Sequence, residues 1–142
     1  MSYRSLAASS QPMEAPLDQN VVWIADGDAA VRSALKFALE LEGLTVHTCA
    51  SGAELLRHLA MAKADCIVLD YKMSQSDDLA DVDRLRLLCA NIPVILIVNV
   101  ATDRVRHLAA RAGVYRILEK PLFDNVLLTT IEEILSQRRT RG

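Results

Sequence analysis

The stretch CIVLD at Cys66–Asp70 decides the fold of this chain, because it is an unbroken apolar run that ends in a carboxylate. Short apolar runs without alternation are typical of strands that are covered on both faces, as in parallel sheets. Two similar runs end at Asp26 and at the pair Lys120-Pro121. In open α/β sheets the ligand crevice lies outside the carboxyl ends of the strands. We therefore expect two carboxylates and one lysine to meet at one edge of a parallel sheet.

Strand-like runs alternate with helical patterns from Val21 to Gln137. Candidate caps precede three of the helices, namely Asp28, Ser51 and Thr102, and Gly43 and Gly113 are candidate helix stops. The last helix is expected from about Leu122 to Gln137. The expected strands are Val21–Ala25, Leu44–Thr48, Asp65–Asp70, Val94–Val98 and Tyr115–Leu118. Five strands and five helices in strict alternation predict a doubly wound α/β fold with a parallel sheet.

Composition excludes several classes of protein. The 142 residues are 51% hydrophobic and 24% charged, which is typical of one globular domain. The net charge is -2, so the chain lacks the excess positive charge of a nucleic-acid binder. Three cysteines without metal-binding spacing argue against a disulfide framework. No apolar stretch reaches the roughly 18 residues of a membrane span. We expect a cytoplasmic protein with a flexible tail over residues 1–20, one domain over 21–137 and a basic tail over 138–142.

Four motifs, taken together and in this order, resemble the receiver domain of two-component response regulators. They are Val22–Asp28 (VWIADGD), Val68–Met73 (VLDYKM), Ile92–Ile95 (IPVI), and Ala112-Gly113 leading to Glu119–Pro121 (EKP). The resemblance covers about residues 20–137. It implies a flavodoxin-like (βα)5 fold with a five-stranded parallel sheet in the order 2-1-3-4-5.

The resemblance also implies a chemistry for the sheet edge. Asp70 would accept a phosphoryl group from a phosphohistidine of a sensor kinase and become an aspartyl phosphate, and Lys120 would supply a fixed positive charge. Mg²⁺ would be held by Asp26, Asp70 and the backbone carbonyl of Lys72.

Three positions depart from the receiver pattern. Gly27 replaces the second acid, so we expect weak Mg²⁺ binding; Asp28 could substitute for it, although capping the first helix is the favoured role. Val98 replaces the Thr or Ser whose hydroxyl reaches the phosphoryl group. Ile117 replaces the aromatic ring that usually switches between exposed and buried positions.

These observations predict a stand-alone, divergent receiver that takes its signal from a histidine kinase or phosphotransfer protein. The fourth helix, fifth strand and last helix would form its docking surface, with a homodimer through that surface as one option. The alternative is a phosphorylation-independent scaffold that binds a kinase or another regulator. An aspartate-nucleophile phosphatase would need an acid where Lys72 stands, and no helix-turn-helix follows residue 137. We therefore expect neither an enzyme nor a DNA-binding regulator.

Overall fold

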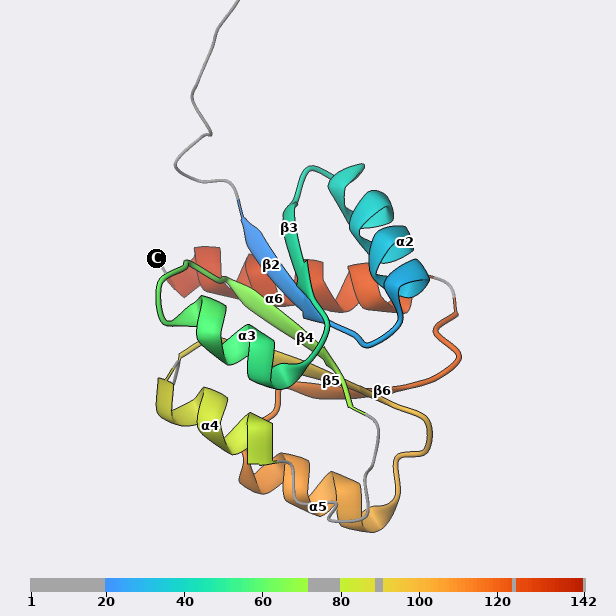
Figure 1. Cartoon of the computed structure of the whole chain (residues 1–142), viewed down its shortest axis with the longest axis vertical. Helices are drawn as coiled ribbons and strands as arrows, with labels where there is room; N and C mark the ends of the chain where they lie inside the picture. The colour runs from blue at the N-terminus through green and yellow to red at the C-terminus, as the bar shows by residue number, and fades with distance from the viewer. Residues whose placement is uncertain (1–19, 72–79, 89–90, 124, 142) are drawn as a thin grey trace, which may run out of the picture.

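Five parallel strands form the single sheet of the computed structural model, which describes residues 20–71, 80–88, 91–123 and 125–141 (Figure 1). The strand order is β3-β2-β4-β5-β6, which confirms the predicted order 2-1-3-4-5. The strands are β2 Val21–Ala25, β3 Thr45–Cys49, β4 Cys66–Asp70, β5 Val94–Val98 and β6 Arg116–Glu119. The helices are α2 Ala29–Glu40, α3 Gly52–Leu59, α4 Ala80–Leu88, α5 Asp103–Arg111 and α6 Val126–Arg141.

The helices cover both faces of the sheet, so the core has two layers (Figure 1). On one face, apolar side chains of α3, α4 and α5 pack on the strands, among them Leu55, Val82 and Val105. On the other face, α2 and α6 contribute Leu39 and Ile131, among others. The three central strands β2, β4 and β5 are apolar on both faces because helices cover both sides of them, and β5 is buried along its whole length.

The predicted caps are confirmed. Asp28 accepts hydrogen bonds from the backbone N–H groups of Ala30 and Val31 at the start of α2, and Thr102 accepts one from Val105 at the start of α5. Both predicted stops have a positive φ, +91° at Gly43 and +77° at Gly113, a conformation that side chains with a Cβ rarely adopt.

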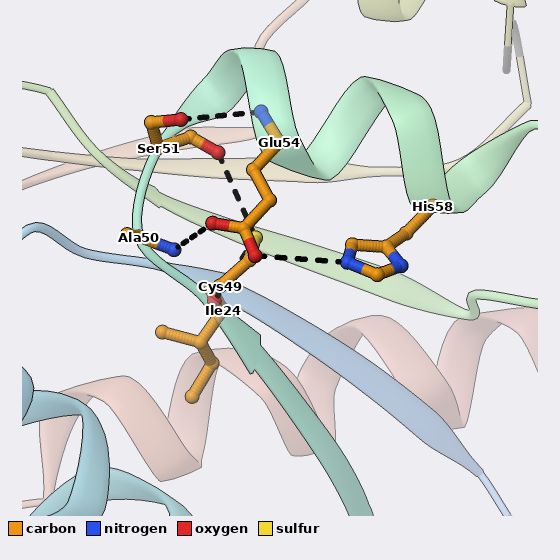
Figure 2. Close-up of polar contacts among 6 residues, drawn as sticks. All are labelled: Ile24, Cys49, Ala50, Ser51, Glu54 and His58. Carbon is orange, nitrogen blue, oxygen red and sulfur yellow. Dashed lines mark hydrogen bonds and ion pairs between the residues drawn. The ribbon is translucent and has the colours of Figure 1, made fainter.

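A reciprocal hydrogen-bond arrangement starts α3, as Figure 2 shows. Ser51 Oγ accepts the N–H of Glu54 at 3.1 Å, and the Glu54 carboxylate accepts the N–H of Ala50 at 2.9 Å. The same carboxylate lies 3.7 Å from Nε2 of His58. Below them, burial raises the pKa of the Cys49 thiol to about 11. This thiol is therefore an inert part of the core at neutral pH.

The last helix differs from the prediction at both ends. It starts at Val126 rather than Leu122, because the preceding Asn125 adopts a positive φ of 60°, which a helix cannot continue. It continues past Gln137 to Arg141, so the expected end at Gln137 is wrong. Arg138 donates a hydrogen bond to the carbonyl of Asn91 and lies 4.0 Å from the Asp65 carboxylate. These contacts hold the last turn of α6 in place. The basic composition of residues 138–141 alone does not predict this turn.

The first helix is less buried than its sequence predicts. The spacing of Val31, Leu35, Ala38 and Leu39 by itself predicts an apolar stripe that points inward. Of the twelve residues of α2, all of them described, Leu39 alone is buried. Leu35 is half-buried, whereas Val31 and Ala38 are exposed. The helix lies at the edge of the molecule beside β3 and α6 (Figure 1), so less of its circumference is covered.

Candidate functional site

The strand register brings the carboxyl ends of β2, β4 and β6 to one edge of the sheet. Ala25 pairs with Leu69, which places Asp26 beside the end of β4, and Asp70 pairs with Ile97. The N–H of Lys120 donates to the carbonyl of Val98 at 2.9 Å, which fixes the lysine beyond the end of β6. The predicted meeting of two carboxylates and a lysine is thus confirmed.

Asp70 and Lys120 form an ion pair across the sheet edge. Lys120 Nζ donates to Asp70 Oδ2 at 3.0 Å. The Asp70 side chain is 4% exposed, whereas the lysine side chain is 36% exposed. The cation therefore lies between solvent and a nearly buried carboxylate, and that carboxylate has one oxygen in contact with it.

Asp26 is the second acid of the site and is buried to 3% exposure. One of its oxygens accepts the N–H of Asp28 at 2.8 Å, which orients the carboxylate. Its carboxyl group also lies within hydrogen-bonding reach of the Asp70 carboxyl. Two acids and one lysine thus lie together at the sheet edge, a charge balance that favours binding of a further cation.

The pKa of Asp70 is raised above its ordinary value. Burial is the main cause, and the neighbouring Asp26 carboxyl adds to it, while the hydrogen bond from Lys120 acts in the opposite direction. Without a further cation, the protonated form of Asp70 is therefore favoured relative to the same side chain in water.

The Gly27 position is open. A Cβ built there would meet the Ala50 carbonyl oxygen at 3.9 Å as its nearest neighbour, which is ordinary contact distance. The backbone therefore accommodates a side chain, and the acid that the receiver pattern places here is missing for no steric reason. Asp28 caps α2 with its carboxylate, so it is committed elsewhere.

Val98 is fully buried at the end of β5 and packs in the layer under α4 and α5. Its methyl groups offer no hydrogen-bond donor to the site. Ile117 on β6 is half-buried against the same layer. Lys72, whose carbonyl was predicted as a metal ligand, lies outside the described residues, as do Met73 and Leu79.

A cavity of about 500 Å³ adjoins the acidic pair. Asp26 and Lys120 line one part of it, and apolar side chains line the rest: Val31, Leu35, Ile97, Pro121 and Leu122. This cavity was not predicted, because Val31 and Leu35 were expected to point inward and Leu122 to lie in the last helix.

Sequence reasoning also missed two supporting contacts. Arg32 Nη1 donates to the backbone carbonyl of Asp26 at 2.7 Å, so the first turn of α2 holds the strand end that carries the acid. Glu119 accepts the N–H of Ala101 at 2.6 Å, which ties the end of β6 to the loop after β5. The first contact could have been predicted from the basic residue that follows Asp26 by six positions.

Comparisons with known proteins agree with this geometry. The response regulator receiver domain family model matches residues 22–132. The chain belongs to the response regulator receiver domain family. Receivers are signalling domains of two-component systems, in which phosphorylation depends on Mg²⁺. Among the described residues of this receiver, no helix is long and apolar enough to cross a bilayer.

Curated relatives of this receiver are longer proteins. It is 34% identical over 119 residues to the transcriptional regulatory protein PrrA of Mycobacterium leprae, a match that covers 82% of this chain and 50% of that protein. It is 28% identical to the DNA-binding transcriptional regulator NtrC of Escherichia coli, with coverage of 84% and 26%. The chain therefore spans half or less of the length of these relatives.

Solved structures confirm the fold. A response regulator receiver protein from Burkholderia phymatum is 32% identical, with a TM-score of 0.69 and coverage of 83% of this chain and 96% of that one. A receiver domain protein from Methanospirillum hungatei has a TM-score of 0.81 at 22% identity, with coverage of 88% and 100%.

The residues at the sheet edge fit Mg²⁺ in part. Two adjacent carboxylates, Asp26 and Asp70, are oxygen ligands of the kind that Mg²⁺ prefers. Within the described part of the chain, however, no group of three or more His, Cys, Asp or Glu side chains gathers to hold a metal. The glycine at position 27 contributes no carboxylate to this edge.

Proposed function

We propose that this receiver accepts a phosphoryl group on Asp70 from a phosphohistidine of a histidine kinase or phosphotransfer protein. The observation that supports this most directly is the 3.0 Å contact between Lys120 Nζ and Asp70 Oδ2, with the Asp26 carboxyl beside it. In the transfer, a carboxylate oxygen of Asp70 forms a bond to phosphorus as the nitrogen–phosphorus bond breaks, and the imidazole leaves with the electron pair of that bond.

The lysine has a defined part in this reaction. As a phosphoryl group arrives, negative charge gathers on its oxygens, and a cation that is already in place stabilises that charge without reorganisation. Lys120 is held beyond the strand end by its own backbone, so its ammonium needs no large movement to remain near the transferred group. A bound Mg²⁺ would supply further positive charge, with Asp26 and Asp70 as its carboxylate ligands.

We also propose that Mg²⁺ binding is weaker than in receivers with a second acid, since Gly27 contributes no ligand. The signal would pass on through protein contact at the surface formed by α5, β6 and the start of α6. Several basic side chains line α5 there, and Phe123 is 67% exposed. A homodimer through this surface, a cytoplasmic location, a stand-alone chain and the lack of enzymatic turnover stay predictions.

A phosphorylation assay tests the proposal directly. The protein is incubated with acetyl phosphate and Mg²⁺ and then weighed intact by mass spectrometry. We expect the wild type to gain the mass of one phosphoryl group, Asp70→Asn to gain none, and the control Asp103→Asn, on the first turn of α5, to behave as the wild type. Equal labelling of Asp70→Asn would show that another residue is the acceptor.

The second candidate function is a phosphorylation-independent scaffold. The buried Val98 favours it, because a phosphoryl group at Asp70 would lack the hydroxyl contact that other receivers provide. If the wild type takes up no phosphate, while Gly27→Asp combined with Val98→Thr does, the scaffold function is supported. Such a result would show that the fold can accept a phosphoryl group, and that the natural Gly27 and Val98 prevent it.

A further inference from the structure

The first helix carries an apolar stripe on its outer side. The stripe consists of Ala30, Ala34, Phe37 and Leu41, all of which are exposed. Phe37 is 68% exposed and Leu41 is 70% exposed. Their spacing of four, three and four residues is that of the a and d positions of a coiled coil, which places them along one side of the helix. No described residue buries this stripe.

The position of the helix makes the stripe accessible. In Figure 1, α2 lies at the periphery, beside β3 and near α6. The charged neighbours Lys36 and Glu40 pair with each other at 2.9 Å on the same helix, so they add little net charge beside the stripe. An exposed apolar strip is typical of a surface that another protein covers.

The sizes of the side chains indicate what covers it. The stripe is small in its first half, at Ala30 and Ala34, and large in its second half, at Phe37 and Leu41. When two copies of the helix pack antiparallel about a two-fold axis, Leu41 meets Ala30 of the second copy, and Phe37 meets Ala34 of the second copy. Each large side chain then faces a small one at both ends of the contact, which is the self-complementarity that a two-fold interface requires.

The flanking positions are compatible with the same arrangement. In an antiparallel pair, Ser33 lies near Glu40 of the second copy, and Val31 lies near Ala38 of the second copy. These two flanking pairs bring no like charges together, and the helix dipoles run in opposite directions. A parallel pair would instead place Phe37 against Phe37 and Ala34 against Ala34, with a collision at one level and a gap at another.

We propose that α2 is a homodimer interface, formed by antiparallel packing of the Ala30, Ala34, Phe37 and Leu41 stripe on that of a second copy. A helix of this length measures only about 18 Å, so the contact falls at the small end of specific interfaces. The dimer is accordingly weak, with a dissociation constant on the order of 100 µM.

The location of the interface gives the dimer a consequence for the acceptor site. Val31 borders the stripe and also lines the cavity next to Asp26 and Lys120. A second copy on α2 therefore flanks the opening of that cavity, where it restricts a bulky protein donor more than a small acyl phosphate. This consequence rests on the proposed function, whereas the dimer itself does not.

Sedimentation equilibrium from about 10 µM to 1 mM, a range that brackets the expected dissociation constant, tests the interface. We expect the wild type to dimerise with rising concentration and Phe37→Glu to stay monomeric. The matched control is Phe123→Glu, because Phe123 is a phenylalanine of nearly equal exposure, 67%, on the α5, β6 and α6 surface. The control should dimerise as the wild type does. Loss of the dimer in Phe123→Glu instead of Phe37→Glu would place the dimer on that other surface and refute the proposal.

A residue swap tests the antiparallel pairing. Ala34→Phe alone brings two phenylalanines together and should weaken the dimer at least tenfold, on the order of 1.4 kcal/mol. The double variant Ala34→Phe with Phe37→Ala again faces large against small and should restore it. Failure of the double variant to dimerise, with an unchanged circular dichroism spectrum, would refute this pairing. A wild type that stays monomeric at all concentrations would refute the dimer and leave the stripe to a different protein.

Phosphorylation provides an independent readout. Phe37→Glu should take up phosphate from acetyl phosphate at the wild-type rate, because the substitution lies outside the acceptor site. If the wild type takes up no phosphate, the result counts against the proposed function alone. If the wild type does not dimerise, the result counts against the interface alone.

Discussion

Lys120 Nζ lies 3.0 Å from Asp70 Oδ2, and the two residues come from the ends of β6 and β4, which are separated by β5 in the sheet. The contact crosses the end of β5, where Val98 is buried and contributes no polar group to the site. The lysine therefore counters part of the negative charge of Asp70 and Asp26, but it does not prevent the rise in the pKa of Asp70. The site holds an excess of negative charge that a ligand cation or protonation can relieve.

Asp70→Asn should stabilise the fold at neutral pH. Folding raises the pKa of Asp70 above its ordinary value of 3.8, so this carboxyl favours the folded state below 3.8 and loses that contribution as the pH rises through the raised value. The amide does not ionise and avoids the loss. We expect a melting temperature about 2–6 °C higher than wild type at pH 7, which corresponds to roughly 1 kcal/mol. Thermal melts at several pH values measure this.

The pH series contains its own control. The difference between Asp70→Asn and the wild type should shrink as the solution becomes more acidic. Mg²⁺ should raise the melting temperature of the wild type and leave that of Asp70→Asn nearly unchanged, because the variant lacks one of two carboxylate ligands. A variant that is less stable than the wild type at pH 7 would mean that the Lys120 contact outweighs burial.

Gly27→Asp should tighten Mg²⁺ binding at least tenfold, or roughly 1.4 kcal/mol, because it adds a carboxylate to a pair that already lies together. The open space at this position makes the substitution sterically acceptable. Trp23 reports the titration from β2, three residues before Asp26. Its ring lies 4.8 Å from that of His47 and 5.1 Å from that of His58, so the titration is run at constant pH.

Two variants complete the metal experiment. Asp28→Ser keeps a capping side chain on α2 and removes a carboxylate, so its affinity for Mg²⁺ should match the wild type. If Asp28→Ser binds more weakly, or if Gly27→Asp brings no improvement, Asp28 completes the metal shell despite its capping role. The same titration of Gly27→Asp in the Asp70→Asn background should show a loss of the gained affinity.

The sequence predicted the meeting of Asp26, Asp70 and Lys120 better than the surroundings of these residues, for a physical reason. Asp26, Asp70 and Lys120 sit at fixed steps beyond apolar runs, and parallel pairing converts those steps into proximity. The exposure of Val31 and the delayed start of α6 depend instead on how far an edge helix is covered and on one backbone conformation at Asn125. Neither is encoded in the spacing of apolar residues. The cavity beside the acidic pair, which depends on both, was therefore missed.

Arg86 on α4 should be important for stability. It donates hydrogen bonds to the carbonyls of Ala112 at 2.8 Å, Gly113 at 2.5 Å and Ile92 at 3.3 Å. It thereby satisfies acceptors at the end of α5, which a lysine cannot reach with the same fork. Arg86→Lys should lower the free energy of unfolding by about 2 kcal/mol in urea titrations. The exposed Arg104→Lys serves as the control, and equal stability of both variants would show that these bonds contribute little.

Val98→Thr should restore a response to phosphorylation. Valine and threonine are close in shape, but the buried hydroxyl lacks a defined partner until a phosphoryl group is present, so we expect the unmodified variant to lose about 1–2 kcal/mol of stability. With the beryllofluoride mimic bound, the hydroxyl gains an acceptor, and a ligand shifts an equilibrium only through such differential contacts.

Hydrogen exchange on α5, β6 and α6 should therefore change little in the wild type on adding the mimic and Mg²⁺, and clearly more in Val98→Thr. Size-exclusion chromatography of the same samples reports any change of assembly. If the wild type responds strongly and Val98→Thr responds no more than the wild type, this receiver switches by another route. That route would need neither a hydroxyl at position 98 nor an aromatic ring in place of Ile117.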